Sequence, residues 1–274
     1  MRQVELHHGA ATDVGRVREV NEDAWLAIPP VFVVADGMGG HEGGDVASGI
    51  VVEEFARLAA EGYDPERGVL AVAAAIEAAQ RRIGEYAEEQ AARGVDRRRS
   101  AGTTVVAALL VEESGEPAWL LANLGDSRAY RFSDGVLDQV STDHSLVQEL
   151  VDAGRIRPEE AATHPERNVI TRALGETVGA EADYFVLRLA DAERVLLCSD
   201  GVTGMLDDAA VATILAETAD PRDAADGLVA AAVAAGGEDN ATAVVVDVVG
   251  LVADDGYDSV RQRASLEQKL GARP

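Results

Sequence analysis

Short apolar runs along the chain predict a fold rich in strands. Runs of Val, Leu, Ile and aromatic residues that are bounded by Gly, Pro or Asp are typical of β-strands. We expect strands at residues 4–12, 23–28, 31–36, 103–112, 117–126, 127–135, 183–190, 194–200 and 240–249. The neighbouring residues Asp134 and Gly135 predict a hairpin turn.

Other segments repeat apolar residues at helical spacing. Val46, Ile50 and Phe55, for example, recur near the helical period of about 3.6 residues. Residues 155–170 look irregular or weakly helical. Patterns of the helical kind predict helices at residues 45–60, 65–90, 145–154, 207–217 and 221–237.

The order of these elements favours one fold class. Strands outnumber helices and do not alternate regularly with them, which favours mainly antiparallel sheets covered by helices over a doubly wound parallel sheet. We therefore expect an α+β domain over residues 1–249, where no long linker interrupts the chain. Residues 250–274 become polar and charged, and we expect a C-terminal tail there.

Composition narrows the cellular setting. The formal charge of −25 opposes binding to nucleic acid, whose phosphates need a basic surface. No run is long and apolar enough for a membrane span, and the first residues lack the apolar core of a secretory signal. Cys198 is the only cysteine, which excludes an internal disulfide and fits a reducing, cytoplasmic location.

Acidic residues stand at the ends of several predicted strands, often beside glycine. A single carboxylate at such a place is most often a turn residue or a helix cap. Several of them at one end of one domain would repel each other unless a cation neutralised them. Because carboxylate oxygens select hard ions, the sequence predicts a magnesium or manganese site rather than zinc. The residues concerned are Glu22, Asp23, Asp36, Asp126, Asp200 and Asp239.

Six short motifs occur in order along the chain and reveal a family resemblance. They are TDVGRVREVNED (12–23), VVADGMGGHEGGDVAS (33–48), AGTT (101–104), NLGDSRAY (123–130), LCSDGVTG (197–204) and GGEDNAT (236–242). Each is weakly specific alone, but the ordered set resembles the metal-dependent protein phosphatases (PPM, type 2C serine/threonine phosphatases) of bacteria. The resemblance covers about residues 4–248. It implies a four-layer αββα sandwich of two sheets flanked by paired helices, with the metal site at one end.

The resemblance also implies roles for the residues of a two-metal centre. Asp36 would bridge two Mn²⁺ or Mg²⁺ ions, and the carbonyl of Gly37 would bind one of them. Asp200 and Asp239 would complete the coordination of the other ion.

Further metal contacts are implied around this pair. Glu22 and Asp23 would act directly or through metal-bound waters. Asp126 together with Asp200 would hold a third, looser ion. Some relatives have an Asp where this chain has Gly204, which weakens the expectation of a third ion.

Substrate contacts are implied as well. Arg18 resembles the phosphate-binding arginine of the family, and its planar fork can hold two phosphoryl oxygens. Met38 stands where animal relatives often have His, so we assign substrate contact or proton donation to His41, with a metal-bound water as an equal alternative. Residues 141–170 resemble a flap beside the site.

The implied activity is hydrolysis of phosphoserine and phosphothreonine by direct attack of a metal-bridging water or hydroxide. Phosphorylated proteins, above all serine/threonine kinases and their substrates, would be the partners, and we expect a monomer active in signal transduction. A cysteine-based phosphatase needs Arg six residues after its Cys, where this chain has Gly204. Two alternatives remain: a catalytically silent phosphoprotein-binding module, and a regulator dedicated to one anti-sigma-type partner.

Overall fold

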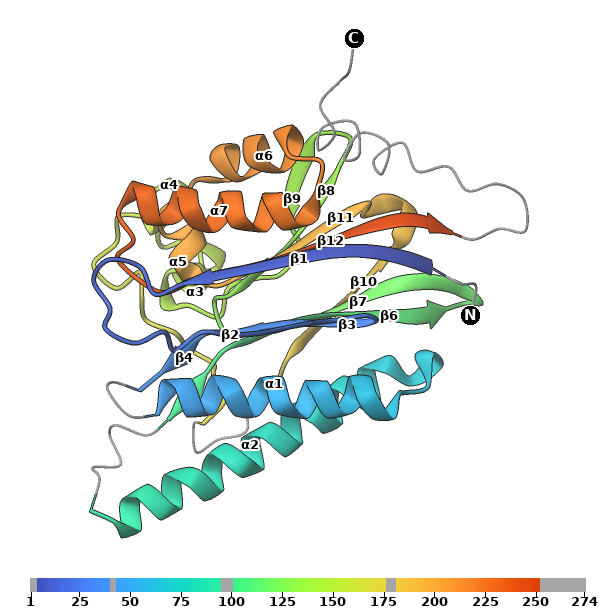
Figure 1. Cartoon of the computed structure of the whole chain (residues 1–274). Coiled ribbons are helices and arrows are strands. Elements are labelled where there is room, and N and C mark those ends of the chain that lie inside the picture. Colours follow the sequence, from blue (N-terminus) through green and yellow to red (C-terminus); the bar gives the residue numbers. More distant parts are fainter. Residues whose placement is uncertain (1–3, 40–42, 95–100, 176–180, 252–274) are drawn as a thin grey trace.

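The protein folds into four layers, in the order helices, sheet, sheet and helices (Figure 1). The computed structural model describes residues 4–39, 43–94, 101–175 and 181–251. One outer layer is the pair α1 (Gly44–Glu61) and α2 (Gly68–Ala92). The predicted α+β class and αββα layering are confirmed. The other outer layer comprises α5 (Asp200–Thr203), α6 (Asp208–Glu217) and α7 (Pro221–Ala235).

Within each of the two large sheets, all described pairs of neighbouring strands are antiparallel. Sheet A has the order β1 (Val4–Asp13), β12 (Ala241–Leu251), β11 (Arg194–Cys198), β8 (Arg128–Ser133) and β9 (Val136–Gln139). Sheet B has the order β10 (Asp183–Arg188), β7 (Glu116–Leu124), β6 (Val105–Glu113), β3 (Val31–Ala35) and β2 (Ala24–Ile28). Shorter elements are β4 (Gly37–Met38) paired with β5 (Gly102–Thr103), α3 (Leu146–Asp152), α4 (Pro158–Ala161), and the 3₁₀ turns η1 (Pro65–Arg67) and η3 (Leu189–Asp191).

Strand β6 shows why the layers pack as they do. Successive side chains of a strand point to opposite faces of its sheet. Because sheet A covers one face of β6 and the pair α1 and α2 covers the other, both sets are buried and the strand reads as a continuous apolar run. The set toward sheet A is Val106, Ala108 and Leu110, and the set toward the helices is Val105, Ala107, Leu109 and Val111.

Several elements differ from the prediction. The sequence places Asp200 at the end of a strand, but β11 ends at Cys198 and Asp200 begins α5, where unpaired N–H groups favour a carboxylate. The helix expected from Pro65 starts as the turn η1, and α2 itself starts at Gly68. Strand β12 continues past residue 249 to Leu251, and the rest of the predicted tail lies outside the described residues.

A buried ion pair joins sheet A to its helical layer. Arg194, at 1% exposure, donates to Asp247 through Nε at 2.7 Å and Nη2 at 2.8 Å. Its Nη1 also donates to the carbonyls of Leu215 and Thr218, and its Nη2 to that of Ala219. One guanidinium therefore fixes the connection between α6 and α7 against β11 and β12.

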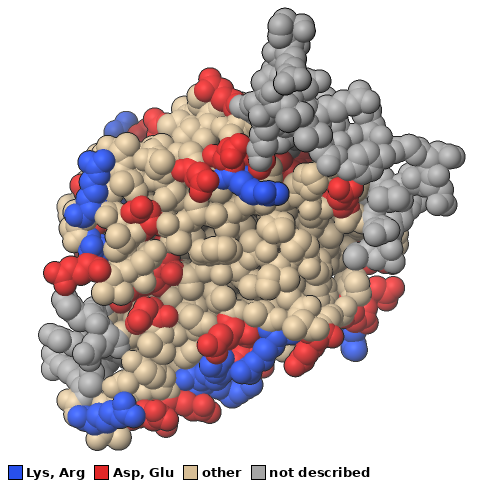
Figure 2. Space-filling model, in the orientation of Figure 1, with Lys and Arg blue, Asp and Glu red and all other residues tan. Residues whose placement is uncertain are grey.

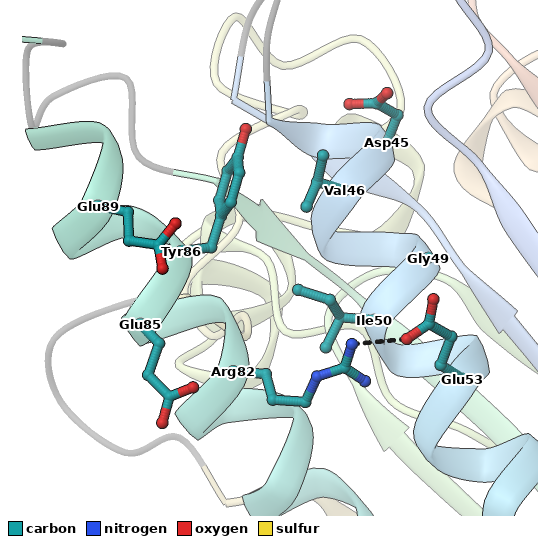
Figure 3. Close-up of a pocket in the computed structure, with 9 residues that line it drawn as sticks. All are labelled: Asp45, Val46, Gly49, Ile50, Glu53, Arg82, Glu85, Tyr86 and Glu89. Carbon is teal, nitrogen blue, oxygen red and sulfur yellow. Dashed lines mark hydrogen bonds and ion pairs between the residues drawn. The ribbon is translucent and has the colours of Figure 1, made fainter. Parts of the chain in front are cut away.

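The outer surface of the other helical layer contains a groove between α1 and α2, with a volume of about 490 Å³ (Figure 3). Arg82 of α2 reaches toward α1 and forms ion pairs with Glu53 and with the buried Glu54, each at 2.6 Å. One lining residue, Asp45, is electrostatically coupled to the predicted metal ligand Glu22: burial raises the pKa of Glu22, and the charge of Asp45 adds to this rise. The lining contains none of the predicted metal ligands.

Charge is dispersed over the face of the molecule shown in Figure 2. Acidic side chains lie next to arginines along the helical layers, with a broad uncharged area between them. Within the described part of the chain, no helix combines the length and apolarity that crossing a bilayer requires.

Candidate metal centre

The predicted carboxylates meet at one end of the sandwich because antiparallel partners end and begin at the same edge. Strand β3 ends before Asp36, and its partner β2 begins after Asp23. Strand β11 ends shortly before Asp200, and its partner β12 begins after Asp239. Asp126 follows β7, whose last residues pair with the start of β6. This end lies at the left of Figure 1, near β4 and α5.

The main chain of Asp36 is fixed by two threonines. Its N–H donates to Thr104 Oγ1 at 3.0 Å, and its carbonyl accepts from the N–H of Thr104 at 2.9 Å. The same carbonyl accepts from Thr103 Oγ1 at 2.9 Å. The backbone that carries the Asp36 carboxylate is therefore held in place at the end of a buried strand.

Gly37 sits where three segments converge. A Cβ at this position would lie 2.3 Å from the carbonyl oxygen of Gly44 and 2.4 Å from that of Glu22. Both contacts are with backbone atoms, which cannot move aside cheaply. Glycine at residue 37 therefore allows the start of α1 and the Glu22 segment to approach the end of β3.

Two carboxylates each have a buried oxygen without a protein partner. Asp23 accepts from Ser199 Oγ at 2.7 Å through Oδ2, but its Oδ1 has no hydrogen-bond partner. Asp126, at 8% exposure, likewise has an unpartnered Oδ1. Buried polar atoms are normally satisfied, so these oxygens fit a bound hard cation.

The pKa values show how closely the carboxylates crowd. Burial, and then the charges of Asp23, Asp200 and Asp126, raise the pKa of Asp36 well above its usual range. Burial raises the pKa of Asp23 and of Asp126 to about 7, and the charge of Asp200 adds to both shifts. The pKa of Asp200 is also raised, by burial and then by Asp239. Divalent cations stabilise such groups in their ionised form.

Arg18 meets this cluster from the loop before β2. Its Nη2 donates to Asp239 Oδ2 at 2.6 Å, and its side chain remains 50% exposed. Burial raises the pKa of the neighbouring Glu22, and the charge of Arg18 offsets part of this rise. Asn240 holds the loop in place: its Oδ1 accepts from the N–H of Glu22 at 2.8 Å, and its Nδ2 donates to the carbonyls of Val14 and Val20.

The arrangement is a set of neighbouring acids rather than a closed coordination shell. Among the described residues, no three His, Cys, Asp or Glu side chains converge with the spacing of a preformed metal site. His41 lies outside the described residues. Met38 is described, in β4, and provides no proton donor.

Neutral residues that were not predicted from the sequence hold the acids in place. Thr104, Ser199 and Asn240 each bond to an acidic residue or its backbone, and Thr104 Oγ1 also lies 2.7 Å from Ser127 Oγ. All four stand inside the motifs quoted above. Their position next to acidic residues in the sequence could have marked them as candidates. Which acidic residue each one contacts depends on how the strands pair, and the sequence does not show this.

The raised pKa values predict an unusual pH dependence for protein stripped of divalent cations. Asp23 and Asp126 titrate near 3.9 when unfolded and near 7 when folded, so their contribution to stability is complete at low pH and is lost as the pH rises through about 7. We expect a lower Tm at pH 8 than at pH 5. Circular dichroism melting in the presence of a chelator would measure this. The variant Asp23→Asn/Asp126→Asn should flatten the dependence, and a wild-type Tm that rises steadily from pH 5 to 8 would contradict it.

Comparison with known proteins identifies the family. The family model for protein phosphatase 2C matches residues 16–235. The serine/threonine phosphatase stp of Listeria innocua is 38% identical over 255 residues, which cover 88% of this chain and 96% of that protein. The crystal structure of Stp1 from Staphylococcus aureus is similar with a TM-score of 0.80 at 34% identity, covering 90% of this chain and 96% of that one.

A further solved structure, the catalytic domain of the serine/threonine phosphatase PstP, contains two manganese ions. It is similar to this chain with a TM-score of 0.76 at 36% identity, covering 90% of this chain and 100% of that one. Both sequence and structure therefore agree over most of the chain. The chain belongs to the protein phosphatase 2C family and is a serine/threonine phosphatase of the bacterial type.

Proposed function

We propose that this phosphatase uses two Mn²⁺ or Mg²⁺ ions, held at the acidic end of the sandwich, to hydrolyse phosphoserine and phosphothreonine in proteins. The observation that supports this best is the pair of buried, unpartnered carboxylate oxygens on Asp23 and Asp126, beside Asp36, whose pKa is raised well above its usual range by burial and neighbouring charges. The two manganese ions in the related PstP structure support the same stoichiometry.

The proposed ligands follow from the geometry and the family resemblance. Four residues would hold the two ions, two more would act directly or through water, and one would help to bind a looser third ion. Gly204 offers no carboxylate to that third position. The first group is Asp36, Gly37, Asp200 and Asp239, the second is Glu22 and Asp23, and the third-ion residue is Asp126, acting with Asp200.

When bound, the two cations would supply a bridging water or hydroxide for direct attack on phosphorus and would neutralise phosphoryl charge. The chain's own contribution to substrate binding centres on Arg18. Asp239 holds one of its nitrogens, and the half-exposed guanidinium has further donors for phosphoryl oxygens. We assign the proton for the leaving alkoxide to His41, with a water molecule of the site as the alternative.

Arg18→Ala is expected to lower kcat/KM for a phosphothreonine peptide by about 10–100-fold, mainly through KM, because a charge-assisted hydrogen bond contributes roughly 1.5–3 kcal/mol. Steady-state kinetics at saturating manganese would measure the change. Arg16→Ala, two residues away and also exposed, is the matched control and should behave like wild type. An unchanged KM in Arg18→Ala would remove this residue from the substrate site.

A manganese titration tests the proposed function as a whole. Phosphate release from a phosphothreonine peptide and from p-nitrophenyl phosphate should require Mn²⁺ or Mg²⁺ and stop on chelation. Calorimetry should show at least two Mn²⁺ bound per chain. A silent phosphoprotein-binding module would bind the peptide without releasing phosphate, and that outcome would reject the proposal.

We further propose that the chain acts as a monomer in the cytoplasm on serine/threonine kinases and their substrates. Its strong acid excess favours protein substrates over nucleic acid. A panel of phosphopeptides addresses the range of substrates. Hydrolysis of many sequences fits a general role, whereas activity restricted to one protein would favour a dedicated regulator. Light scattering would give the oligomeric state.

A further inference from the structure

His144 lies where the chain leaves β9 for the segment predicted as a flap, and it is almost fully buried at 4% exposure. It bonds twice to Gly125. The N–H of His144 donates to the carbonyl of Gly125 at 2.9 Å, and the N–H of Gly125 donates to His144 Nδ1 at 3.1 Å. A single residue therefore restrains the peptide groups on both sides of Gly125, which directly precedes Asp126.

The imidazole ring itself is held from its other side. Nδ1 accepts a hydrogen bond from Gly125, so the ring proton is on Nε2, which donates to Asp183 Oδ2 at 3.0 Å. Arg172 in turn donates to the other oxygen of Asp183 at 3.3 Å. The ring thus has one orientation in which both of its nitrogens are satisfied.

Gly125 needs this restraint. Its φ of +121° is accessible mainly to glycine, and a Cβ there would lie 2.5 Å from Thr104 Cγ2. A glycine in such a conformation has little intrinsic preference to keep the next residue in place. Its bonds to His144, together with one from Asn123 Nδ2 to its carbonyl at 3.1 Å, therefore decide the direction in which Asp126 leaves the end of β7.

We propose that His144 is a positioning residue that sets the direction of Asp126 through Gly125, and with it the affinity of the most weakly bound cation of the centre. This inference rests on the proposed function. Outer residues that orient metal ligands typically contribute about 10–100-fold in metal affinity or activity. His144 touches neither substrate nor metal in this scheme, and its effect passes entirely through the Gly125 peptide groups.

The same contact links the flap-like segment to the acidic residues. Just after the segment ends at residue 170, Leu174 exchanges two backbone hydrogen bonds with Thr103, at 3.1 and 2.9 Å. Thr103 Oγ1 in turn donates to the carbonyl of Asp36. The segment is therefore attached at its beginning beside Asp126 and at its end beside Asp36, so a change in its position reaches both acids.

Two conservative replacements separate positioning from packing. In His144→Asn, Oδ1 takes the place of Nδ1 and can still accept from Gly125. His144→Gln retains more of the volume and can reach Asp183, but it has no acceptor at the Nδ1 position. His164→Ala is the matched control, because His164 Nδ1 also accepts a backbone N–H within the same segment, that of Glu166, and this bond involves none of the proposed metal ligands.

Manganese calorimetry, amide hydrogen exchange at Gly125 and Asp126, and kinetics would be measured on each full-length variant. We expect His144→Asn to stay within about threefold of wild type in affinity for the weakest-bound Mn²⁺, and His144→Gln and His144→Ala to lose about 10–100-fold, with faster exchange at both amides. A role in packing alone predicts the opposite order, with Gln better than Asn. That order, or three variants equal to wild type, would overturn the inference.

Failure of the proposed function would be visible separately. It would appear as wild-type protein that releases no phosphate with manganese. Hydrogen exchange at Gly125 does not require catalysis, so it still decides whether His144 restrains this glycine. Unchanged exchange in His144→Ala would reject the positioning role whatever the enzyme does.

Discussion

Asp36→Asn is expected to lower kcat/KM for a phosphothreonine peptide by about a thousandfold or more, beyond the 10–100-fold typical of residues that only orient metal ligands. Asp36 lies among Asp23, Asp200 and Asp126, whose charges all act on it. Asp36 is the proposed ligand of both ions, and an amide lacks the anionic charge of its carboxylate, so the variant should also bind Mn²⁺ with lower stoichiometry or affinity. Kinetics across a range of manganese concentrations would show whether added metal restores any activity.

Two controls distinguish loss of chemistry from loss of fold. Asp138→Asn makes the same chemical change at a half-exposed residue that pairs with Arg131, and it should leave activity intact. In the presence of a chelator, Asp36→Asn should have a Tm equal to or above that of wild type, because it removes repulsion among buried carboxylates. Full activity in Asp36→Asn would disprove the proposed metal centre.

Arg194→Met is expected to cost about 3–5 kcal/mol of unfolding free energy, because it removes the guanidinium that forms a buried ion pair with Asp247. It also removes the donor from three backbone carbonyls at the α6–α7 connection. For a chain of this size the loss corresponds to roughly 10 °C in Tm. Urea denaturation with manganese present would give the free energy directly.

The matched control is the ion pair between Arg188 and Asp191, where Arg188 is 82% exposed. Arg188→Met should cost less than about 1 kcal/mol, as surface pairs do. The double variant Arg194→Met/Asp247→Leu should be more stable than Arg194→Met alone, since it also removes the buried carboxylate that has lost its ion pair with Arg194. Equal losses of unfolding free energy in Arg188→Met and Arg194→Met would show that burial of the ion pair between Arg194 and Asp247 has little effect.

Much of the fold could be predicted because buried strands have a clear sequence pattern. The run from Val31 to Ala35 is wholly apolar and buried; the pattern predicts its strand type, and its predicted end at Asp36 is one residue beyond the observed end at Ala35. The order of strands within each sheet could not be predicted, because it depends on contacts such as β1 with β12, at opposite ends of the chain. Asp200 was misplaced because a four-residue helix leaves almost no periodic signal.

The acidic residues of the site could be selected from the sequence for a similar reason. A carboxylate next to glycine at the end of a buried strand can be recognised from the order of residues alone. The bond between Arg18 and Asp239 joins residues 221 positions apart, and only the folded structure shows that the two meet. The same holds for His144, whose importance lies in a contact with Gly125 that no local pattern reports.

The two sheets divide the acidic residues between them. Asp23 and Asp36 flank strands of sheet B, whereas Asp200 and Asp239 flank strands of sheet A. A cation shared by both groups would act as a crosslink between the halves of the sandwich, and separating them would require its release. Occupancy and resistance to denaturation would then be thermodynamically linked, with about 2.7 kcal/mol gained when free metal is a hundredfold above its dissociation constant.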